Sequence, residues 1–173
     1  MSVITIDTSA EMEAFGRWLA AHLRDGDVVV LTGTLGAGKT TLTRGLGEGL
    51  GVLTPVQSPT FIVAREHERA HSDAPRLVHI DAYRLGSSAE LDDLDIDWAD
   101  SISVVEWGRP HVLAVATSWL DIDIALMGGG GEVPDETADE DFPRQITLTA
   151  HSATGVVDNR LQTIVEAAHD FGH

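Results

Sequence analysis

Residues 33–40 read Gly-Thr-Leu-Gly-Ala-Gly-Lys-Thr and fit the pattern G-x-x-x-x-G-K-[ST] of a phosphate-binding loop. A continuous apolar run, residues 28–31, comes directly before this loop and is typical of a strand that is buried on both faces. A helical pattern follows over about residues 39–50 and ends at Gly51, a residue type that suits a helix C-terminus. The motif needs this order of strand, loop and helix, so the segment predicts a nucleotide-binding α/β domain.

The residue types of the loop explain the expected chemistry. Glycines let successive backbone N–H groups turn towards a phosphate, and the helix N-terminus adds the positive end of its dipole. We expect Lys39 to bring a compact charge to the β- and γ-phosphates and the Thr40 hydroxyl to hold Mg²⁺. The predicted contacts in the loop are Thr34, Leu35, Gly36, Ala37, Gly38, Lys39 and Thr40.

The charge of the chain is strongly negative, with 11 Lys and Arg against 28 Asp and Glu and a formal net charge of −17. A chain this acidic repels a nucleic-acid backbone, so we expect no direct grip on nucleic acid and a basic protein partner instead. Lys39 is the only lysine in the sequence. The guanine-recognition motif of GTPases requires a second lysine, and its lack favours ATP.

The sequence contains no cysteine, which excludes disulfides and thiolate metal sites and suits a reducing cytoplasm. No window approaches the roughly 18 apolar residues of a membrane span, and no secretory signal is visible at the N-terminus. We therefore expect a cytoplasmic protein without membrane contact.

The rest of the chain predicts a single domain over residues 1–173. Strands alternating with helices indicate a P-loop NTPase-like three-layer α/β fold, with a mainly parallel sheet and an antiparallel excursion over residues 61–81. Strands are expected at residues 61–64, 77–80, 102–105, 119–126 and 145–149, and helices after caps at Thr8, Ser87 or Ser88, and Asp158. The first helix is expected to end at residues 25–26, and residues 65–75 to form a loop. Residues 128–141, four glycines and then an acidic run, predict a flexible acidic loop.

Two acids end predicted strands and are candidates to hold Mg²⁺ or to position the attacking water. Asp81 ends one apolar run and Glu106 another, although a strand-end acid can also simply face solvent. Thr60 lies in a segment that is either a turn or a switch that senses the γ-phosphate. Trp107 is equally suited to stacking on a base and to filling the core. His79 is more typical of a hydrogen-bonded strand residue than of a base or ligand.

Four motifs in order resemble the bacterial TsaE (formerly YjeE) family, the ATPase of tRNA threonylcarbamoyladenosine biosynthesis. They are residues 33–41, Ser-Pro-Thr-Phe at 58–61, His-Ile-Asp-Ala-Tyr-Arg-Leu at 79–85, and Glu-Trp at 106–107. The resemblance runs from about residue 8 to residue 126. It implies a P-loop α/β fold and Mg²⁺-dependent ATP hydrolysis in a complex with TsaD-like and TsaB-like proteins, which modify tRNA. Contact with tRNA would then be indirect, through the complex.

The resemblance also implies roles for single residues. Lys39 becomes a catalytic phosphate ligand, Thr40 a metal ligand and Thr41 a nucleotide contact. Thr60 becomes the switch hydroxyl and Trp107 an aromatic residue of the nucleotide site. Asp81 and Glu106 become the catalytic acids that bind the metal or orient water, and the pattern leaves open which of them touches Mg²⁺.

The sequence departs from the family after residue 107. The family usually continues Glu-Trp-Pro-Glu, whereas Gly108, Arg109 and Pro110 stand here, so no role is carried onto Arg109. Residues 128–141 correspond to no recognised feature of the family and are either a plain solvated loop or an element that contacts a partner. A small-molecule kinase and a non-catalytic ATP-dependent adaptor remain as alternatives. The kinase is disfavoured because residues 128–141 contain no arginine for a lid. Since no obvious arginine finger is visible, we expect a partner to complete the hydrolysis site.

Overall fold

The computed structural model describes residues 1–59, 61–67, 70–71, 76–127 and 142–171. These residues form a seven-stranded sheet in the order β1-β7-β6-β2-β5-β4-β3. The strands are β1 Ser2–Ile6, β2 Val28–Gly33, β3 Ala64–His67, β4 Arg76–Asp81, β5 Ser101–Glu106, β6 Ser118–Leu126 and β7 Arg144–Ser152. The helices are α1 Ser9–Ala20, α2 Lys39–Leu50, α3 Ser88–Asp92 and α4 Asn159–Ala168, with 3₁₀ turns η1 Ala82–Arg84 and η2 Val112–Ala114.

The centre of the sheet is parallel. β6, β2, β5 and β4 pair in parallel, whereas β3 pairs antiparallel with β4 at one edge and β7 pairs antiparallel with β6 and β1 at the other. The expected parallel sheet and the expected antiparallel excursion over residues 61–81 are thus confirmed, and a second antiparallel region lies at the opposite edge. In this arrangement β2, β5 and β4 end side by side, which is where open α/β sheets place their ligands.

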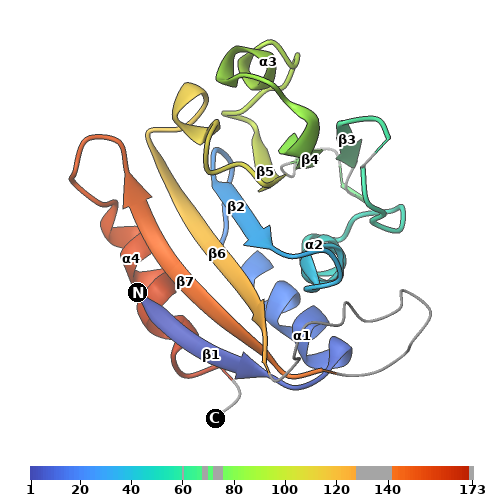
Figure 1. Cartoon of the computed structure of the whole chain (residues 1–173), viewed down its shortest axis with the longest axis vertical. Coiled ribbons are helices and arrows are strands. Elements are labelled where there is room, and N and C mark those ends of the chain that lie inside the picture. Colours follow the sequence, from blue (N-terminus) through green and yellow to red (C-terminus); the bar gives the residue numbers. More distant parts are fainter. Residues whose placement is uncertain (60, 68–69, 72–75, 128–141, 172–173) are drawn as a thin grey trace.

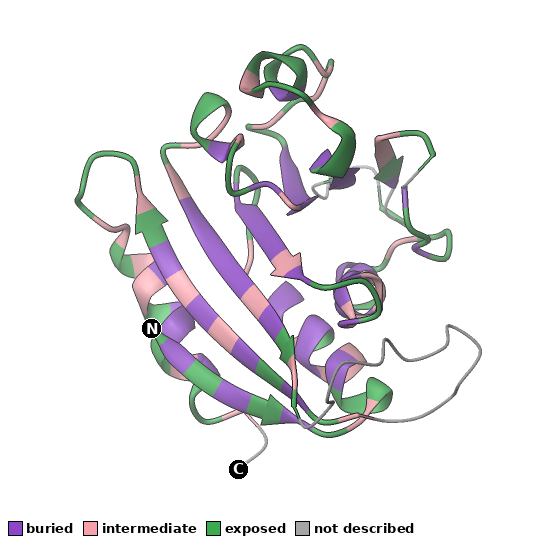
Figure 2. Cartoon of the chain, in the orientation of Figure 1, coloured by how far each residue is buried: buried purple, intermediate pink, exposed green. Residues whose placement is uncertain are grey.

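Helices cover the two faces of the sheet unequally. α1, α2 and α4 pack on one face and bury the larger apolar cluster, which includes Phe15, Leu46 and Ile164 (Figure 1). The short α3 and the 3₁₀ turns contribute to the cover of the other face, over a smaller cluster that contains Leu91 and Val112. The central strands are buried along most of their length (Figure 2). The predicted three layers are therefore present, and one outer layer is thin.

Glycines bring α1 and α2 into unusually close contact. A Cβ on Gly16 of α1 would lie 2.3 Å from the Leu42 carbonyl oxygen, and one on Gly45 of α2 would lie 2.1 Å from the Glu13 carbonyl oxygen. The two helix backbones can therefore approach only because these positions carry no side chain. This packing fixes α2, and with it the loop that precedes α2, against the rest of the domain.

Three predicted helix caps are confirmed. The Thr8 hydroxyl accepts a hydrogen bond from the Glu11 N–H at 3.1 Å, and the Ser87 and Asp158 side chains cap α3 and α4 in the same way. The first helix, however, ends at Ala20 rather than at residues 25–26, because residues 21–27 form turns that return the chain to β2.

Two strand predictions were incomplete or wrong. The five-residue edge strand β1 was not predicted. β3 occupies residues 64–67, not 61–64, because the Ile62 and Val63 N–H groups donate to the Pro59 carbonyl in a turn and Val63 has a φ of 67°. Thr60 and residues 128–141 lie outside the described residues. Within the described part of the chain, no helix has the length and apolar character that crossing a bilayer requires.

Candidate nucleotide site

A cavity of about 640 Å³ opens at the ends of β2, β5 and β4, within the usual range of small-molecule sites of roughly 300–1,000 Å³. Its walls come from the loop after β2, the first turn of α2, and segments after β4 and β5. The lining residues are Thr34, Leu35, Gly36, Gly38, Lys39, Thr40, Thr41, Ser58, Asp81, Tyr83, Arg84, Glu106, Trp107 and Arg144.

The loop between β2 and α2 has the backbone shape that its glycines predict. Gly36 has a φ of 77° and Gly38 a φ of 109°, values in the left-handed region where a side chain is strained. Gly38 is the N-cap of α2 and offers no side chain to cap it. The N-terminal amides of α2 therefore have no side-chain competitor for an anion.

Lys39 is buried at the centre of the cavity wall. Its ammonium donates to the carbonyl oxygens of Gly33 at 2.9 Å and Thr34 at 3.2 Å, lies 4.0 Å from Oε2 of Glu106, and stands 4.7 Å from the centre of the Trp107 ring. Burial lowers the pKa of Lys39 below its ordinary value, an effect that the nearby carboxylates of Glu106 and Asp81 oppose. The ammonium is thus held by carbonyl oxygens of its own loop rather than by a close ion pair.

Asp81 and Glu106 lie beside each other on adjacent strands. They are register partners in the parallel β4–β5 pair, and both side chains are buried. Oδ1 of Asp81 accepts a hydrogen bond from the Tyr83 N–H at 3.1 Å, and Oε1 of Glu106 lies 2.8 Å from Nε2 of His79. The sequence prediction that two strand-end acids meet beside the loop agrees with this geometry, and neither acid simply faces solvent.

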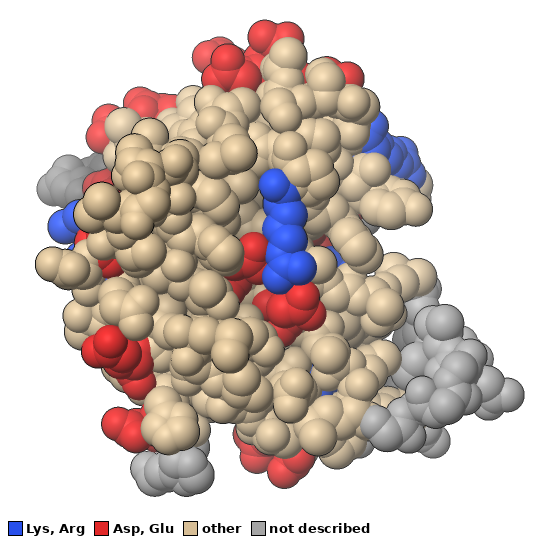
Figure 3. Space-filling view, turned by 60° about the vertical axis from the view of Figure 1, so that its left-hand side comes forward, with Lys and Arg blue, Asp and Glu red and all other residues tan. Residues whose placement is uncertain are grey.

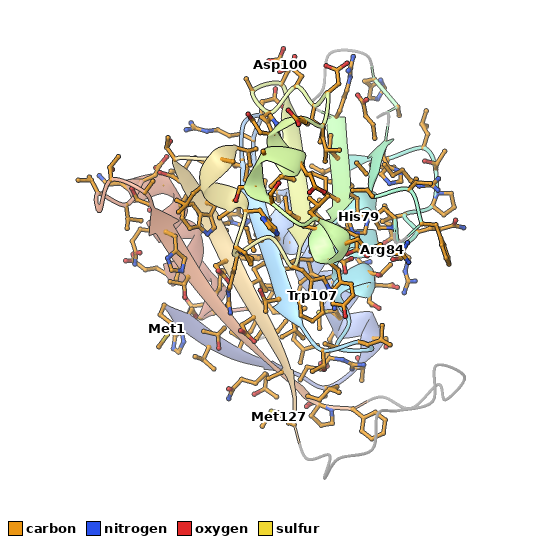
Figure 4. All side chains as sticks on the ribbon, turned by 45° about the horizontal axis from the view of Figure 1, so that its top comes forward. Met1, His79, Arg84, Asp100, Trp107 and Met127 are labelled. Carbon is orange, nitrogen blue, oxygen red and sulfur yellow. The ribbon has the colours of Figure 1, made fainter. Side chains whose placement is uncertain are left out.

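Aromatic residues form the outer wall of the cavity. Trp107 has a φ of 61°, a strained value for a bulky residue, and its ring lies 5.6 Å from that of Tyr83. Arg84 lies above the ring of Phe61, at 5.8 Å from its centre. His79, Arg84 and Trp107 fall in one region of Figure 4, well apart from Asp100 and Met127. Trp107 thus contributes to the cavity wall rather than to the core alone.

The structure brings most predicted site residues together and separates one of them from the cavity. Thr34, Leu35, Gly36, Gly38, Lys39, Thr40, Thr41, Asp81, Glu106 and Trp107 all line it. Ala37 is instead fully buried in the larger apolar cluster and does not line the cavity. Thr60 is not among the described residues, although Ser58 of the same motif lines the cavity. The binding and catalytic roles stay predictions.

Sequence reasoning missed Arg144, the first residue of β7. Its Nε donates to the Ala37 carbonyl oxygen at 3.0 Å and its Nη1 donates to the Phe142 carbonyl oxygen at 2.6 Å, and the residue is buried. The partner in the loop is 107 positions away in sequence, so no local pattern could have found this contact. Arg84 and Arg144 both line the cavity, although the sequence suggests no obvious arginine finger.

Arg109 has a different environment. Its guanidinium donates to both carboxylate oxygens of Asp121, at 2.7–3.0 Å, and lies 3.0 Å from Oδ2 of Asp123. Hydrogen bonding to Asp121 raises the pKa of Arg109 further above its already high value. Arg109 does not line the cavity at the ends of β2, β5 and β4.

The donor set fits Mg²⁺ bound together with a nucleotide. Mg²⁺ prefers oxygen ligands and is usually held by one or two carboxylates with substrate phosphates and waters. Thr40, Asp81 and Glu106 offer one hydroxyl and two carboxylates in one cavity. Among the described residues, no group of three or more His, Cys, Asp or Glu side chains could hold a metal by itself. A magnesium ion held here by Thr40, Asp81 and Glu106 would take its remaining ligands from waters and phosphate oxygens.

The surface agrees with the acidic composition. On the face drawn in Figure 3, basic side chains are sparse, and acidic side chains lie both around the rim and beside the basic side chain at the centre, so the described residues of that face form no basic stripe. This face therefore offers no basic surface for nucleic acid.

The fold and the loop define a P-loop NTPase-like domain, and comparisons with known proteins narrow the class. The family model of the threonylcarbamoyl adenosine biosynthesis protein TsaE matches residues 6–129. A tRNA threonylcarbamoyladenosine biosynthesis protein TsaE of Streptomyces coelicolor is 51% identical over 141 residues, which cover 80% of this chain and 89% of the relative. The protein of the same name from Bacillus subtilis is 33% identical over 165 residues, covering 92% and 90%.

A solved structure has the same fold along nearly the whole chain. The crystal structure of Bacillus subtilis YdiB superposes with a TM-score of 0.68 at 30% sequence identity, covering 97% of this chain and 95% of that one. The chain belongs to the TsaE family.

Proposed function

We propose that this chain is an Mg²⁺-dependent ATPase that acts in tRNA threonylcarbamoyladenosine biosynthesis, in the cytoplasm and in a complex with TsaD-like and TsaB-like proteins. Membership of the TsaE family supports the pathway. The arrangement of Lys39, Asp81 and Glu106 around one cavity supports the chemistry.

The position of Lys39 is the observation on which the proposal chiefly depends. Its ammonium is buried, yet its hydrogen bonds go to carbonyl oxygens of Gly33 and Thr34 rather than to a carboxylate. Phosphate oxygens are stronger acceptors for an ammonium than neutral carbonyls. A triphosphate in the cavity would therefore attract Lys39 away from these carbonyls, and the amides at the start of α2 would bind the same phosphates.

The reaction would be the attack of water on the γ-phosphorus, with cleavage of the bond to the β-phosphate oxygen and release of ADP and phosphate. Thr40, Asp81 and Glu106 would hold Mg²⁺, which neutralises charge on the phosphates when bound. Glu106 or Asp81 would orient the attacking water. Trp107 would border the nucleotide.

The rim of the cavity supports a partner that closes over the nucleotide. Leu35 and Tyr83 line the cavity and are 66% and 71% exposed, and Phe61, beside Arg84, is 89% exposed. Large apolar side chains left open around a binding site are typical of an interaction surface. A TsaD-like protein bound there would exclude water from the phosphates and complete the site.

The test measures phosphate release from ATP by the chain alone and with its TsaD-like and TsaB-like proteins. We expect slow turnover alone and faster turnover in the complex. Glu106→Gln, which keeps the shape of the side chain, should retain ATP binding and lose turnover by about 100-fold or more. A loss of this size is usual when a group that moves or orients a proton is removed.

Each alternative function has its own outcome. Transfer of the γ-phosphate to a metabolite, without stimulation by the partners, would favour a small-molecule kinase. ATP-dependent binding of the partners with no turnover in any mixture would favour a non-catalytic adaptor. Unchanged turnover in Glu106→Gln would contradict the role given to Glu106.

A further inference from the structure

His79 is a fully buried histidine on β4 whose ring points to the candidate site. Residues 77, 79 and 81 lie on one face of β4, the face that carries Asp81 to the cavity. Nε2 of His79 lies 2.8 Å from Oε1 of Glu106 on the neighbouring strand, and neither side chain is more than 6% exposed. His79 itself does not line the cavity. It therefore lies behind Glu106, on the side away from any nucleotide.

The bond to Glu106 is the only one that the ring makes within the described residues. Nδ1 of His79 is buried and has no hydrogen-bond partner there. A buried imidazole with one unpaired nitrogen costs free energy, so packing alone does not explain a histidine at this position. An ionised carboxylate only accepts hydrogen bonds, and the proton between the two groups must then belong to Nε2.

The two oxygens of Glu106 have different neighbours. Oε1 faces His79, whereas Oε2 lies 4.0 Å from the ammonium of Lys39. If Lys39 turns to phosphate as proposed above, its hold on Oε2 weakens, while His79 stays fixed in the core. The histidine contact then still restrains rotation of the carboxylate from the core side.

We propose that His79 is a positioning residue that holds Oε1 of Glu106 through Nε2–H and so presents Oε2 to the nucleotide cavity. The inference rests on the proposed function for its effect on turnover, and on the geometry alone for the hydrogen bond. Loss of a partner that orients a ligand or catalytic group usually lowers activity by about 10–100-fold.

The hydrogen bond is tested without any reaction. Imidazole ¹⁵N spectra of histidine-labelled protein, with the His79 signals assigned from His79→Gln, should show the Nε2–H tautomer with its proton shifted downfield. Glu106→Gln should move that signal. A His79 that carries its proton on Nδ1, or one that does not respond to Glu106→Gln, would overturn the proposal.

The effect on turnover is tested by two matched variants. Gln at position 79 can place an amide N–H near the position of Nε2, whereas Asn reaches only to about the position of Nδ1. We expect His79→Gln to retain most of the turnover and His79→Asn to lose about 10–100-fold in kcat with little change in the KM for ATP. Equal losses in both variants, or none in His79→Asn, would overturn the role, because a residue that only fills space does not distinguish them.

The two readouts separate this proposal from the proposed function. If the wild-type protein hydrolyses no ATP under any condition, the ATPase assignment fails while the spectra still decide the hydrogen bond. Melting temperatures of both variants show whether a loss of kcat reflects unfolding.

Discussion

Lys39 and Arg109 are both cations beside carboxylates, but they are bound in opposite ways. The Lys39 side chain is 7% exposed, and its nearest carboxylate oxygen, on Glu106, is 4.0 Å away. The Arg109 side chain is 46% exposed and forms bonds of 2.7–3.0 Å to Asp121 and Asp123. Close pairing would be needed most where burial is deepest, so the loose environment of Lys39 does not serve stability.

The difference distinguishes a side chain that is available to a ligand from one that makes a structural contact. Arg109 is fully engaged by Asp121, in the bidentate geometry that Arg and carboxylate favour. Lys39 and Asp81 bond chiefly to backbone groups, which leaves their charges for a ligand. We therefore expect substitutions at Lys39 to affect ATP binding and substitutions at Arg109 to affect stability.

The largest expected effect is on ATP affinity in Lys39→Met. Each hydrogen bond to a charged group contributes about 1.5–3 kcal/mol, so loss of the contacts to two phosphates should weaken ATP binding by at least about 100-fold. The melting temperature of Lys39→Met should stay within a few degrees of the wild-type value, because burial of the charged ammonium is itself unfavourable and its loss offsets the loss of the two hydrogen bonds. Titration with a fluorescent ATP analogue and thermal melting measure the two quantities. Tight binding by the variant would contradict the assignment of the loop.

Arg109→Leu should show the opposite pattern. Loss of its hydrogen bonds leaves the buried carboxylate of Asp121 without its partner, which should cost about 1–3 kcal/mol of unfolding free energy. ATP affinity should remain that of the wild type. Urea denaturation measures the loss, and Arg109→Leu combined with Asp121→Leu should recover part of it. If Arg109→Leu kept its stability but bound ATP more weakly, Arg109 would belong to the binding site and its structural role would be wrong.

The sequence predicted the environment of Lys39 but not that of Arg109. The loop, its flanking strand and helix, and the acids Asp81 and Glu106 follow local patterns, because a buried strand that ends in an acid leaves a recognisable signature. The sequence around Arg109 gave no indication of its partner, since Arg109 follows β5 and Asp121 lies on β6. Contacts between distant segments depend on strand order, which a single sequence does not encode locally.

The predicted limits of β3 and the surroundings of His79 were missed for similar reasons. Residues 61–64 have the composition of a strand, but the turn that begins at Pro59 and the positive φ of Val63 delay β3 to residue 64. His79 looked like an ordinary strand histidine, and only the register of β4 against β5 places it beside Glu106. Tertiary pairing thus determined what local preference could not.

Arg144 is buried, as Lys39 is, but it is an arginine that contacts the loop between β2 and α2. Its Nε donates to the Ala37 carbonyl oxygen, and we expect this bond to help fix the shape of the loop. Arg144→Met should weaken ATP binding about tenfold, as expected for loss of one hydrogen bond that positions a site. Arg76→Met, which removes an exposed arginine paired with Glu66, serves as the control and should leave affinity unchanged. If Arg144→Met and Arg76→Met both bind ATP with the wild-type affinity, Arg144 contributes only to packing.

The smallest expected effect is a pH-dependent change in stability at His67, a buried residue of β3. Burial, with help from His79 and Arg65, lowers the pKa of His67 below 6.5. The unfolded chain therefore binds a proton more readily than the folded protein, so stability is lost as the pH falls below about 6.5 and is unaffected by this group above it. The loss is complete once the pH has passed below the pKa of the folded state.

His67→Gln removes this titration and isolates it from other acid effects. The difference in melting temperature between wild type and variant should move in favour of the variant between about pH 7.5 and pH 5.5. A constant difference for His67→Gln would mean that the histidine takes up its proton equally in both states. Burial would then not govern its pKa, and the buried polar groups around β3 and β4 would be better solvated than their exposure indicates.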